Sequence, residues 1–424
     1  MKNNTPISSF ERSKVVFKGA AKIGAKKTLS FGKKAFLSNE KKKIEDENVD
    51  DEIAEIIFKN LSFLKGTAIK ISQSLVLHNL LPQKLQKKLS KSFNDVNPIS
   101  QVLVMKVLEN EFGQTYDKIF DKFNLRSFAS ASLGQVHLAK KDDKQLAVKI
   151  QYPSIDKTIK NDLKLLNTIA KMKKNLLPVL DEIKKRLYEE IDYKNEYENT
   201  LWAYENFNSK DIIVPKVYKE FSNTHIITTQ FINAIDLHKW LKTKPSLKSK
   251  TKIAKLLFEI FTKSVFKLHK IQADPNPANY LITGDEKLVL IDFGCVKSFD
   301  SDFIAKYINL FIVYQSHEKK KILKAYKDMG FIKDEKDIDD SLYEQISQFN
   351  DWVVEPFLNK EYKFTKEYLQ KGVKFANLFS SKPFFVVEEF VFLDRTMHGL
   401  FSLFANMEVS VDMQYFRSFI NLNR

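Results

Sequence analysis

Three side chains with oxygen ligands stand at a telling spacing in one stretch of the sequence, "IQADPNPANYLITGDEKLVLIDFG", over residues 271–294. Asp274 is followed five residues later by Asn279, and thirteen residues further on Asp292 opens the triplet Asp-Phe-Gly. Carboxylate and amide oxygens are the hard ligands that Mg²⁺ prefers. The pattern predicts that Asn279 and Asp292 hold Mg²⁺, and that Asp274 accepts a proton or orients an acceptor group.

Phosphoryl transfer from ATP also needs a cation at the phosphates, and Lys149 in "LAVKIQ" is the candidate. A lysine on a strand can reach the α- and β-phosphates. A helix is predicted over 178–207, where Asp192, Glu196 and Asn199 recur at i, i+4 and i+7 and so share one face. Glu196 is expected to pair with Lys149 and hold it.

Each of these residues also has an ordinary structural explanation, because an acid can be an exposed helix charge and a lysine can lie at a strand edge. Together they follow the order and spacing of a protein kinase, which predicts ATP and Mg²⁺ as cofactors. Two features differ from a protein kinase. Gln272-Ala273 stands where His-Arg is expected before Asp274, and no G-x-G-x-x-G occurs upstream.

The elements that must position these residues change in kind along the chain. Apolar residues at helical spacing predict a helix over 53–75, where Lys70, Gln73 and Ser74 share one face that is either functional or solvated. Pro82 opens a second predicted helix. A third opens at Pro98 and Ser100, and Gly113 ends it.

From Arg126 the pattern predicts strands. Residues 127–152 indicate two strands joined by a polar turn at 140–144, and "VPKVYKEF" and "THIITTQFI" indicate two more. A helix is predicted over 154–172. After Ile232 the chain is predicted to be mostly helical, apart from a hairpin in "NYLITGDEKLVLIDFG" that turns at Gly284-Asp285.

The net charge of +16 is concentrated in residues 1–43, which hold twelve Lys or Arg and two Glu, a balance of +10. Apolar residues among these lysines suit a segment lying on anionic lipid, and a solvated tail is the equal alternative. No nucleic-acid recognition motif accompanies the charge, so no nucleic-acid partner is expected. The one cysteine, Cys295, excludes a disulfide framework, and no apolar run reaches membrane-spanning length. The expected location is the cytoplasm or the inner face of a membrane.

Over roughly residues 55–420 the sequence resembles the UbiB/ADCK (aarF-domain) atypical kinase family. "KISQSL" is similar to its K-x-G-Q motif, with Ser72 in place of the glycine, and "FASASLGQVHLA" to its alanine-rich loop. "LAVKIQYPSI" resembles the lysine strand and "EEIDYKNEYEN" the E-x-D motif. "QADPNPANY" is similar to the coenzyme-Q-associated branch, because it has Gln and Asn where many bacterial relatives have His.

The resemblance implies roles for further residues. Lys70 and Gln73 of the K-x-G-Q-like motif would be regulatory, with Lys70 entering the active site and meeting Glu190 and Asp192 of the E-x-D motif. The nucleotide would be bound by Lys149 and Glu196 together with residues of the alanine-rich loop, namely Ala129, Ser130, Ala131, Ser132, Gly134 and Gln135.

The fold class implied is α+β, a protein-kinase-like two-lobe fold with an N-terminal helical extension carrying the K-x-G-Q-like motif. The expected organisation is a basic membrane-surface segment (1–45), the helical extension (46–125), an N-lobe with the alanine-rich loop (126–232) and a helical C-lobe with the catalytic loop (233–424).

The activity implied is that of a Mg²⁺-dependent ATPase supporting isoprenoid quinone or prenyl-lipid metabolism. Its expected partners are ATP, an anionic membrane surface and a prenyl-phenol or quinone lipid. Two alternatives stay open. Asp274 is available to an acceptor hydroxyl, which suits a small-molecule phosphotransferase. A lipid-binding scaffold gated by the nucleotide, with incidental hydrolysis, would carry the same residues.

Overall fold

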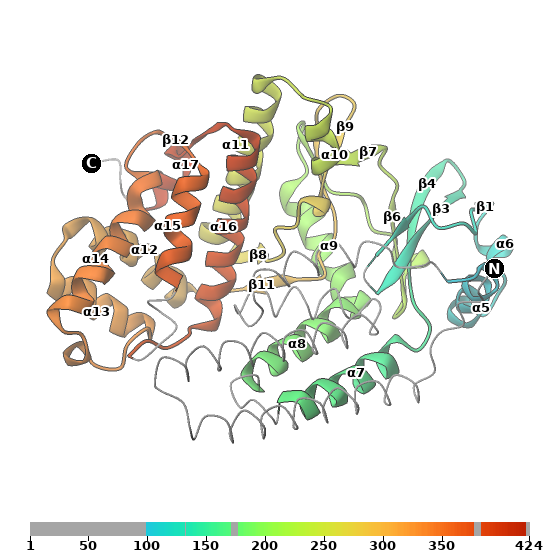
Figure 1. The fold of residues 1–424 in the computed structure, drawn as a ribbon. Coiled ribbons are helices and arrows are strands. Elements are labelled where there is room, and N and C mark those ends of the chain that lie inside the picture. The colour runs from blue at the N-terminus through green and yellow to red at the C-terminus, as the bar shows by residue number, and fades with distance from the viewer. Residues whose placement is uncertain (1–98, 132, 171–176, 377–382, 421–424) are drawn as a thin grey trace, which may run out of the picture. The chain divides into compact units, whose positions relative to one another are not determined.

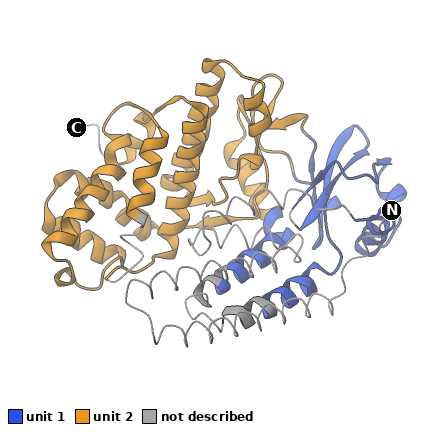
Figure 2. Ribbon diagram, viewed as in Figure 1, with its two compact units in different colours: residues 1–197, 217–231 blue, residues 198–216, 232–424 orange. Residues whose placement is uncertain are grey.

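The structure, a computed structural model, describes residues 99–131, 133–170, 177–376 and 383–420. They divide into two compact units, shown in Figure 2: among the described residues, unit 1 takes those up to 197 and those from 217 to 231, and unit 2 takes 198–216 and those from 232 onward. The helices predicted over 53–75 and from Pro82, and with them Lys70 and Gln73, lie outside the described residues, as does Ser132.

Unit 1 is built on an antiparallel sheet in the order β1-β3-β4-β6, with β2 paired to β3 (Figure 1). Its strands are β1 (Lys122–Phe123), β2 (Ala129–Ser130), β3 (Gly134–Lys141), β4 (Lys144–Gln151) and β6 (Ile226–Gln230). The predicted strand pair is confirmed in β3 and β4. Asp142 in the turn between them has a φ of 52°, a left-handed conformation that aspartate tolerates.

Alternation along β4 places Leu146, Val148 and Ile150 on the core face of this sheet. They pack in one cluster with Val104 and Leu108 of helix α5 (Gln101–Phe112), which α6 (Tyr116–Ile119) follows. As predicted, α5 begins after the cap Ser100, whose hydroxyl accepts from Leu103 N, and ends at Gly113, with a φ of 68°.

The helix predicted over 154–172 is α7 (Ile155–Ala170). The single helix predicted over 178–207 is wrong, because the chain forms α8 (Leu177–Glu190) and α9 (Tyr193–Phe207) with a break between them. The Ile191 carbonyl accepts from Gln151 Nε2 instead of continuing the helix. Asp192 then caps α9, its Oδ1 accepting from Asn195 N at 3.0 Å.

The strand predicted in "VPKVYKEF" is also wrong. Within it only Val217 forms a bridge, to Thr229, and the chain then turns into a short 3-10 helix, η2 (Lys219–Phe221). The Ser222 hydroxyl donates to the Tyr218 carbonyl at 2.7 Å and closes this turn. The neighbouring prediction, "THIITTQFI", is confirmed as β6.

Unit 2 holds a small sheet in the order β5-β10-β9-β7 and two further strand pairs, β11 with β8 and β12 with β13. These strands are β5 (Ile212–Ile213), β7 (Ala234–Asp236), β8 (Lys270–Gln272), β9 (Tyr280–Thr283), β10 (Leu288–Leu290), β11 (Val296–Ser298), β12 (Glu361–Lys363) and β13 (Ser410–Asp412). The predicted hairpin is confirmed as β9 and β10.

Most of unit 2 is helical, as predicted (Figure 1). Its α-helices beyond α9 are α10 (Leu237–Lys242), α11 (Leu247–Phe266), α12 (Ser301–Ser316), α13 (Lys319–Met329), α14 (Asp340–Val354), α15 (Lys366–Ala376), α16 (Glu388–Met407) and α17 (Gln414–Phe419). Short 3-10 helices are η3 (Pro277–Asn279), η4 (Glu335–Asp337) and η5 (Glu355–Phe357). In the centre of the helical core, Phe416 stacks on Phe357 with ring centroids 4.3 Å apart. Across the described ranges, no helix is both long and apolar enough to span a bilayer.

Candidate functional site

In unit 1 the structure brings Lys149 and Glu196 together. Lys149 projects from β4, and its Nζ donates to both carboxylate oxygens of Glu196 on α9, at 2.8 and 2.9 Å. The side chains are 15% and 6% exposed. Lys149 Nζ also lies 5.1 Å from the centre of the Tyr193 ring. This ion pair is short, bidentate and largely shielded from water, so it fixes the position of the lysine ammonium. A cation that binds phosphates requires such a fixed position.

The alanine-rich loop is a hairpin end beside this pair. Ala129 and Ser130 of β2 pair with Val136 and Gln135 of β3, and Ala131 N donates to Gly134 O at 2.9 Å. Gly134 sits against β4, because a Cβ there would lie 2.5 Å from Ile150 O and 2.9 Å from Tyr193 Oη. The glycine therefore allows the loop to approach the strand that carries Lys149.

The Gln135 side chain points into unit 1. Its Oε1 accepts from Ile99 N at 2.9 Å, and its Nε2 lies 2.8 Å from His137 Nε2. His137 Nδ1 contacts the Asn124 carbonyl, and burial lowers the pKa of the imidazole, so the ring is neutral and accepts from Gln135. The Gln135 side chain is therefore occupied inside unit 1. Nucleotide binding by Gln135 stays a prediction, and it would have to involve the backbone of this residue.

In unit 2, the predicted catalytic and metal residues belong to one hydrogen-bonded loop. The Asn279 amide donates to the Asp274 carbonyl at 3.2 Å and lies 3.4 Å from Asp274 Oδ2. Asn276 caps η3 by accepting from Ala278 N, which holds Asn279 at the end of the turn. Ile291 N donates to Asn279 O at 3.0 Å, so Asp292 follows directly beside Asn279.

Asp292 itself has a left-handed backbone, with a φ of 62°. Such conformations cost energy and persist where the surroundings enforce them. Here Gln272 Nε2 donates to the carbonyls of both Ile291, at 2.9 Å, and Asp292. The next residue, Phe293, is buried, and its carbonyl accepts from Asn199 of α9 at 3.2 Å. Gln272, the first of the two residues that stand where a protein kinase has His-Arg, thus ties the end of β8 to the Asp-Phe-Gly segment.

A residue that the sequence did not indicate lies beside Asp274, the predicted catalytic aspartate. Arg395 of α16 places Nη2 3.5 Å from Asp274 Oδ1, with side chains 18% and 21% exposed. The one available signal was the adjacent pair Asp394-Arg395, which interrupts a largely apolar helical stretch that begins with Glu388 and Glu389.

The E-x-D acids lie at the junction of two helices. Glu190 is the last residue of α8, and Asp192 is the exposed cap of α9. The predicted partner of both, Lys70, is outside the described residues, so their regulatory pairing stays a prediction.

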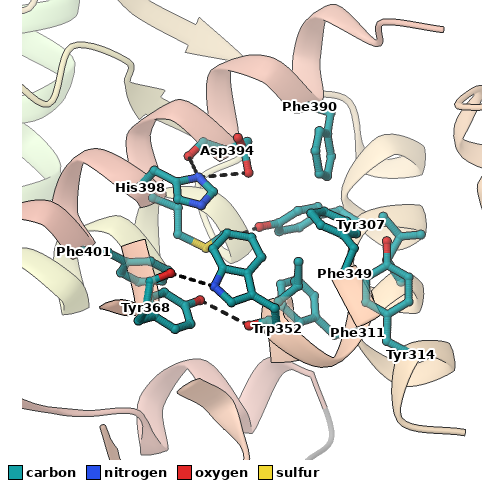
Figure 3. A pocket seen from close by; sticks show the side chains of 13 residues that line it. Tyr307, Phe311, Tyr314, Phe349, Trp352, Tyr368, Phe390, Asp394, His398 and Phe401 are labelled. Carbon is teal, nitrogen blue, oxygen red and sulfur yellow. Dashed lines mark hydrogen bonds and ion pairs between the residues drawn. The ribbon is translucent and has the colours of Figure 1, made fainter. Parts of the chain in front are cut away.

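An aromatic cavity in unit 2 lies between α12, α14, α15 and α16 (Figure 3). Its volume is about 20 Å³, room for a water molecule but not for a nucleotide. Asp394 and His398 face each other in its wall, 3.1 Å apart. This cavity is therefore not a candidate for the ATP site.

The residues present fit Mg²⁺ and ATP. Asn279 and Asp292 offer an amide and a carboxylate oxygen from adjacent positions, which suits an ion that takes one or two protein ligands and completes its shell with phosphates and water. Lys149 offers a fixed ammonium. Unit 1 thus holds a strand lysine paired with a helix glutamate, and unit 2 holds an Asp-x4-Asn loop followed by the Asp-Phe-Gly segment. These are features of a protein-kinase-like fold.

Comparison with known proteins assigns the family. Residues 91–326 match the ABC1 atypical kinase-like domain, and the chain belongs to this family. The resemblance to the UbiB/ADCK family is thereby confirmed, including its coenzyme-Q-associated branch.

Two curated relatives show how far the likeness extends. The chain is 28% identical over 306 residues to a probable serine/threonine-protein kinase, abkA, of Dictyostelium discoideum, covering 66% of this chain and 54% of that one. It is 28% identical over 388 residues to the mitochondrial atypical kinase COQ8 of Saccharomyces cerevisiae, covering 87% and 75%. The chain thus spans about half of the Dictyostelium protein's length.

A solved structure has the same fold. The chain in the complex of Rv3197 with erythromycin from Mycobacterium tuberculosis matches with a TM-score of 0.63 at 22% identity, covering 89% of this chain and 97% of that one. This likeness supports the kinase-like fold class.

Proposed function

We propose that this protein is a Mg²⁺-dependent ATPase of the atypical kinase type that acts in isoprenoid quinone or other prenyl-lipid metabolism. The observation that carries the proposal is the Lys149–Glu196 pair, short, two-point and largely shielded from water. In kinase-type phosphoryl transfer this pair must be in place for the lysine to act on the α- and β-phosphates.

The other roles follow from the chemistry of each group. Asn279 and Asp292 would hold Mg²⁺ against the phosphates, and the bound ion would neutralise charge that develops on the transferred phosphoryl group. Asp274, beside Asn279, would orient the attacking water. The loop around Ala129, Ser130, Ala131, Ser132 and Gly134 would cover the phosphates with backbone N–H groups.

The lipid side of the proposal rests on the family and on charge. The balance of +10 in residues 1–43 suits an anionic membrane surface, where each basic residue contributes about 1 kcal/mol of attraction. Binding to anionic vesicles should weaken as salt rises, because screening shortens the range of charge attraction. A truncated chain starting at Asp46 is the control. Equal vesicle binding by this chain would rule out the basic segment as the anchor.

The proposed function is tested by steady-state ATP hydrolysis with and without Mg²⁺, anionic vesicles and a phenol that mimics a quinone precursor. We expect Mg²⁺-dependent turnover that vesicles or the phenol raise. Turnover that is equal in wild type and Asp292→Asn would contradict the proposal.

The same assay separates the two alternatives. Phosphate transferred to an added hydroxyl compound, rather than released as inorganic phosphate, would favour a small-molecule phosphotransferase, for which Asp274 is available. Tight ATP binding without turnover, together with nucleotide-dependent lipid binding, would favour the scaffold.

The K-x-G-Q-like motif would restrain this activity. Lys70, supported by Gln73, would pair with Glu190 and Asp192, and a lysine held near the phosphates would limit phosphoryl transfer while allowing nucleotide binding. Lys70→Ala should then change turnover, nucleotide preference or autophosphorylation without unfolding the protein. Unchanged values for all three would exclude this restraint.

A further inference from the structure

Helix α16 contacts the catalytic loop of unit 2 at two positions one turn apart. Arg395 reaches Asp274, with Nη2 3.5 Å from Oδ1. Gly399 lies four residues later, against the residue after Asp274, because a Cβ at this glycine would come within 2.4 Å of Pro275 Cγ. Residues at i and i+4 share one face of a helix, so this face presents both a charge and a close packing contact to the loop.

The Asp274 carboxylate is held from two sides. Oδ1 faces Arg395 and Oδ2 faces the Asn279 amide at 3.4 Å. Both contacts are long, so each one alone orients the carboxylate only weakly. The Arg395 contact is one of the interactions that set the direction of the carboxylate toward water or an acceptor.

Arg395 is itself in a poorly solvated place. Its Nη1 is buried, and within the part of the chain that the structure describes it has no hydrogen-bond acceptor. A cation that gives up solvation interacts more strongly with a nearby carboxylate. The attraction between Arg395 and Asp274 is therefore stronger than that of a solvated surface pair at the same distance.

The neighbouring face of α16 is anchored elsewhere. In Figure 3, Asp394 and His398 face each other in the wall of the aromatic cavity. The His398 ring stacks on Trp352 of α14, with centroids 5.3 Å apart and planes 11° from parallel. These contacts seat the helix on its neighbours while Arg395 extends to the catalytic loop.

We propose that Arg395 is a positioning residue that fixes the Asp274 carboxylate for reaction. This inference rests on the proposed ATP hydrolysis and adds a residue to it. Arg395 acts through Asp274, so its loss lowers the rate of chemistry and leaves nucleotide binding intact. Misplacing a catalytic group by about 1 Å can cost on the order of 10²-fold in rate, which sets the size of the effect.

The test is a double-mutant cycle of Arg395→Gln and Asp274→Asn in the full-length protein, measuring kcat and MgATP affinity. Arg395→Gln should lower kcat on the order of 10²-fold and change ATP affinity by less than about threefold. In the Asp274→Asn background, the arginine substitution should have no further effect on kcat, because the group it positions is gone. An unchanged kcat, or two losses that multiply, would overturn the proposal.

Asp394→Asn is the matched control, since it removes a charge one residue away that points to the cavity. It should keep the wild-type kcat. If it lowers kcat as much as Arg395→Gln does, the losses report a general disturbance of α16, and the proposal fails.

A second cycle with the same four proteins measures thermal unfolding, which needs no turnover. The two substitutions should be non-additive in melting temperature, because each removes one partner of the same ion pair. If the wild-type protein does not hydrolyse ATP, the proposed ATPase activity is refuted, but the pairing of Arg395 with Asp274 is still tested by the melting temperatures. Additive melting temperatures would refute the pairing of Arg395 with Asp274.

Discussion

Each unit of the molecule holds one predicted catalytic group in an ion pair, and the two pairs are built differently. In unit 1 the functional group is the cation, Lys149, and Glu196 holds it with two contacts of 2.8 and 2.9 Å. In unit 2 the functional group is the carboxylate, Asp274, and Arg395 Nη2 lies 3.5 Å from its Oδ1. The shorter pair is also less exposed than the longer one.

The difference in length and exposure between the two ion pairs fits the roles proposed for Lys149 and Asp274. Lys149 would bind phosphates throughout the reaction, so a rigid geometry serves it. Asp274 would orient water and exchange hydrogen bonds as the reaction proceeds, and contacts at catalytic residues are often long before substrate binds. A loose pair can tighten then, whereas a short pair already has its final geometry.

Breaking the short pair should produce the largest effect. Glu196→Gln leaves the Lys149 ammonium in a poorly solvated site without its carboxylate, and removing one partner of a buried pair typically costs about 3–5 kcal/mol. We expect a lower unfolding free energy and weaker MgATP binding. Denaturant unfolding and nucleotide titration measure the two effects.

The matched control for this prediction is Glu198→Gln, an exposed acid two residues along the same helix. Replacing both members of the pair, with Lys149→Met and Glu196→Leu, should restore stability without restoring ATP binding. If Glu196→Gln and Glu198→Gln behave alike, the short pair has no special role.

Much of unit 1 could be predicted from the sequence because its signals are local. The strand pattern over 127–152 predicted two strands joined by a turn at 140–144, and it placed Lys149 on the second strand, as β4 confirms. The break between α8 and α9 was missed because the Gln151–Ile191 bond, which helps end α8, joins residues distant in sequence. The cap itself was a readable signal, since Asp192 precedes the helix it starts.

The contact between Arg395 and Asp274 could not be predicted from local sequence signals. Arg395 lies far along the chain from Asp274, and only the packing of α16 on the catalytic loop brings the two together. Periodicity places Arg395 on a helix but does not say which element that helix faces. Asp274, Asn279 and Asp292 were predicted from their kinase-like spacing, and the hairpin of β9 and β10 brings Asp292 next to Asn279.

Substituting the proposed metal ligand Asp292 tests unit 2 without changing either ion pair. Asp292→Asn removes a carboxylate charge from a site for a hard cation, and MgATP should no longer bind well. A ligand at about 100 times its Kd stabilises a protein by about 2.7 kcal/mol, and this gain should disappear. Thermal shift with MgATP is the measurement, and Asp302→Asn, an exposed acid on α12, is the control. Full MgATP stabilisation in Asp292→Asn would mean that this loop does not hold the metal.

Gly134 in unit 1 and Gly399 in unit 2 are both tightly packed, so substituting each one tests the two units by steric overlap. Gly134→Ala would push a Cβ against Ile150 O and Tyr193 Oη, and Gly399→Ala against Pro275. Overpacking of this kind costs about 1–3 kcal/mol. We expect Gly134→Ala to weaken MgATP binding and Gly399→Ala to lower kcat at unchanged binding, because Pro275 adjoins Asp274. The assignment of the two glycines would be contradicted if Gly134→Ala lowered kcat at unchanged binding and Gly399→Ala weakened MgATP binding.

The smallest expected effect is a difference in how the stability of the two units depends on pH. One histidine in each unit causes it. In unit 1, burial lowers the pKa of His137, so its contribution to stability is present above pH 6.5 and declines as pH falls through the lowered pKa. In unit 2, burial opposes the charged form of His398, but the charge and hydrogen bonds of Asp394 outweigh burial and raise the pKa. The contribution of His398 is therefore complete below pH 6.5 and is lost as pH rises through the raised pKa.

The two histidines should therefore respond to pH in opposite directions. The melting-temperature gap between wild type and His137→Gln should widen from pH 5.5 to pH 8.5, whereas the gap for His398→Gln should narrow, each by on the order of 1 °C. Differences from wild type remove the titration of all other groups from the comparison. In an Asp394→Asn background the His398→Gln gap should lose its pH dependence, since the carboxylate that raises the pKa is gone. Gaps that move together with pH would show that Asp394 does not stabilise the protonated His398 ring.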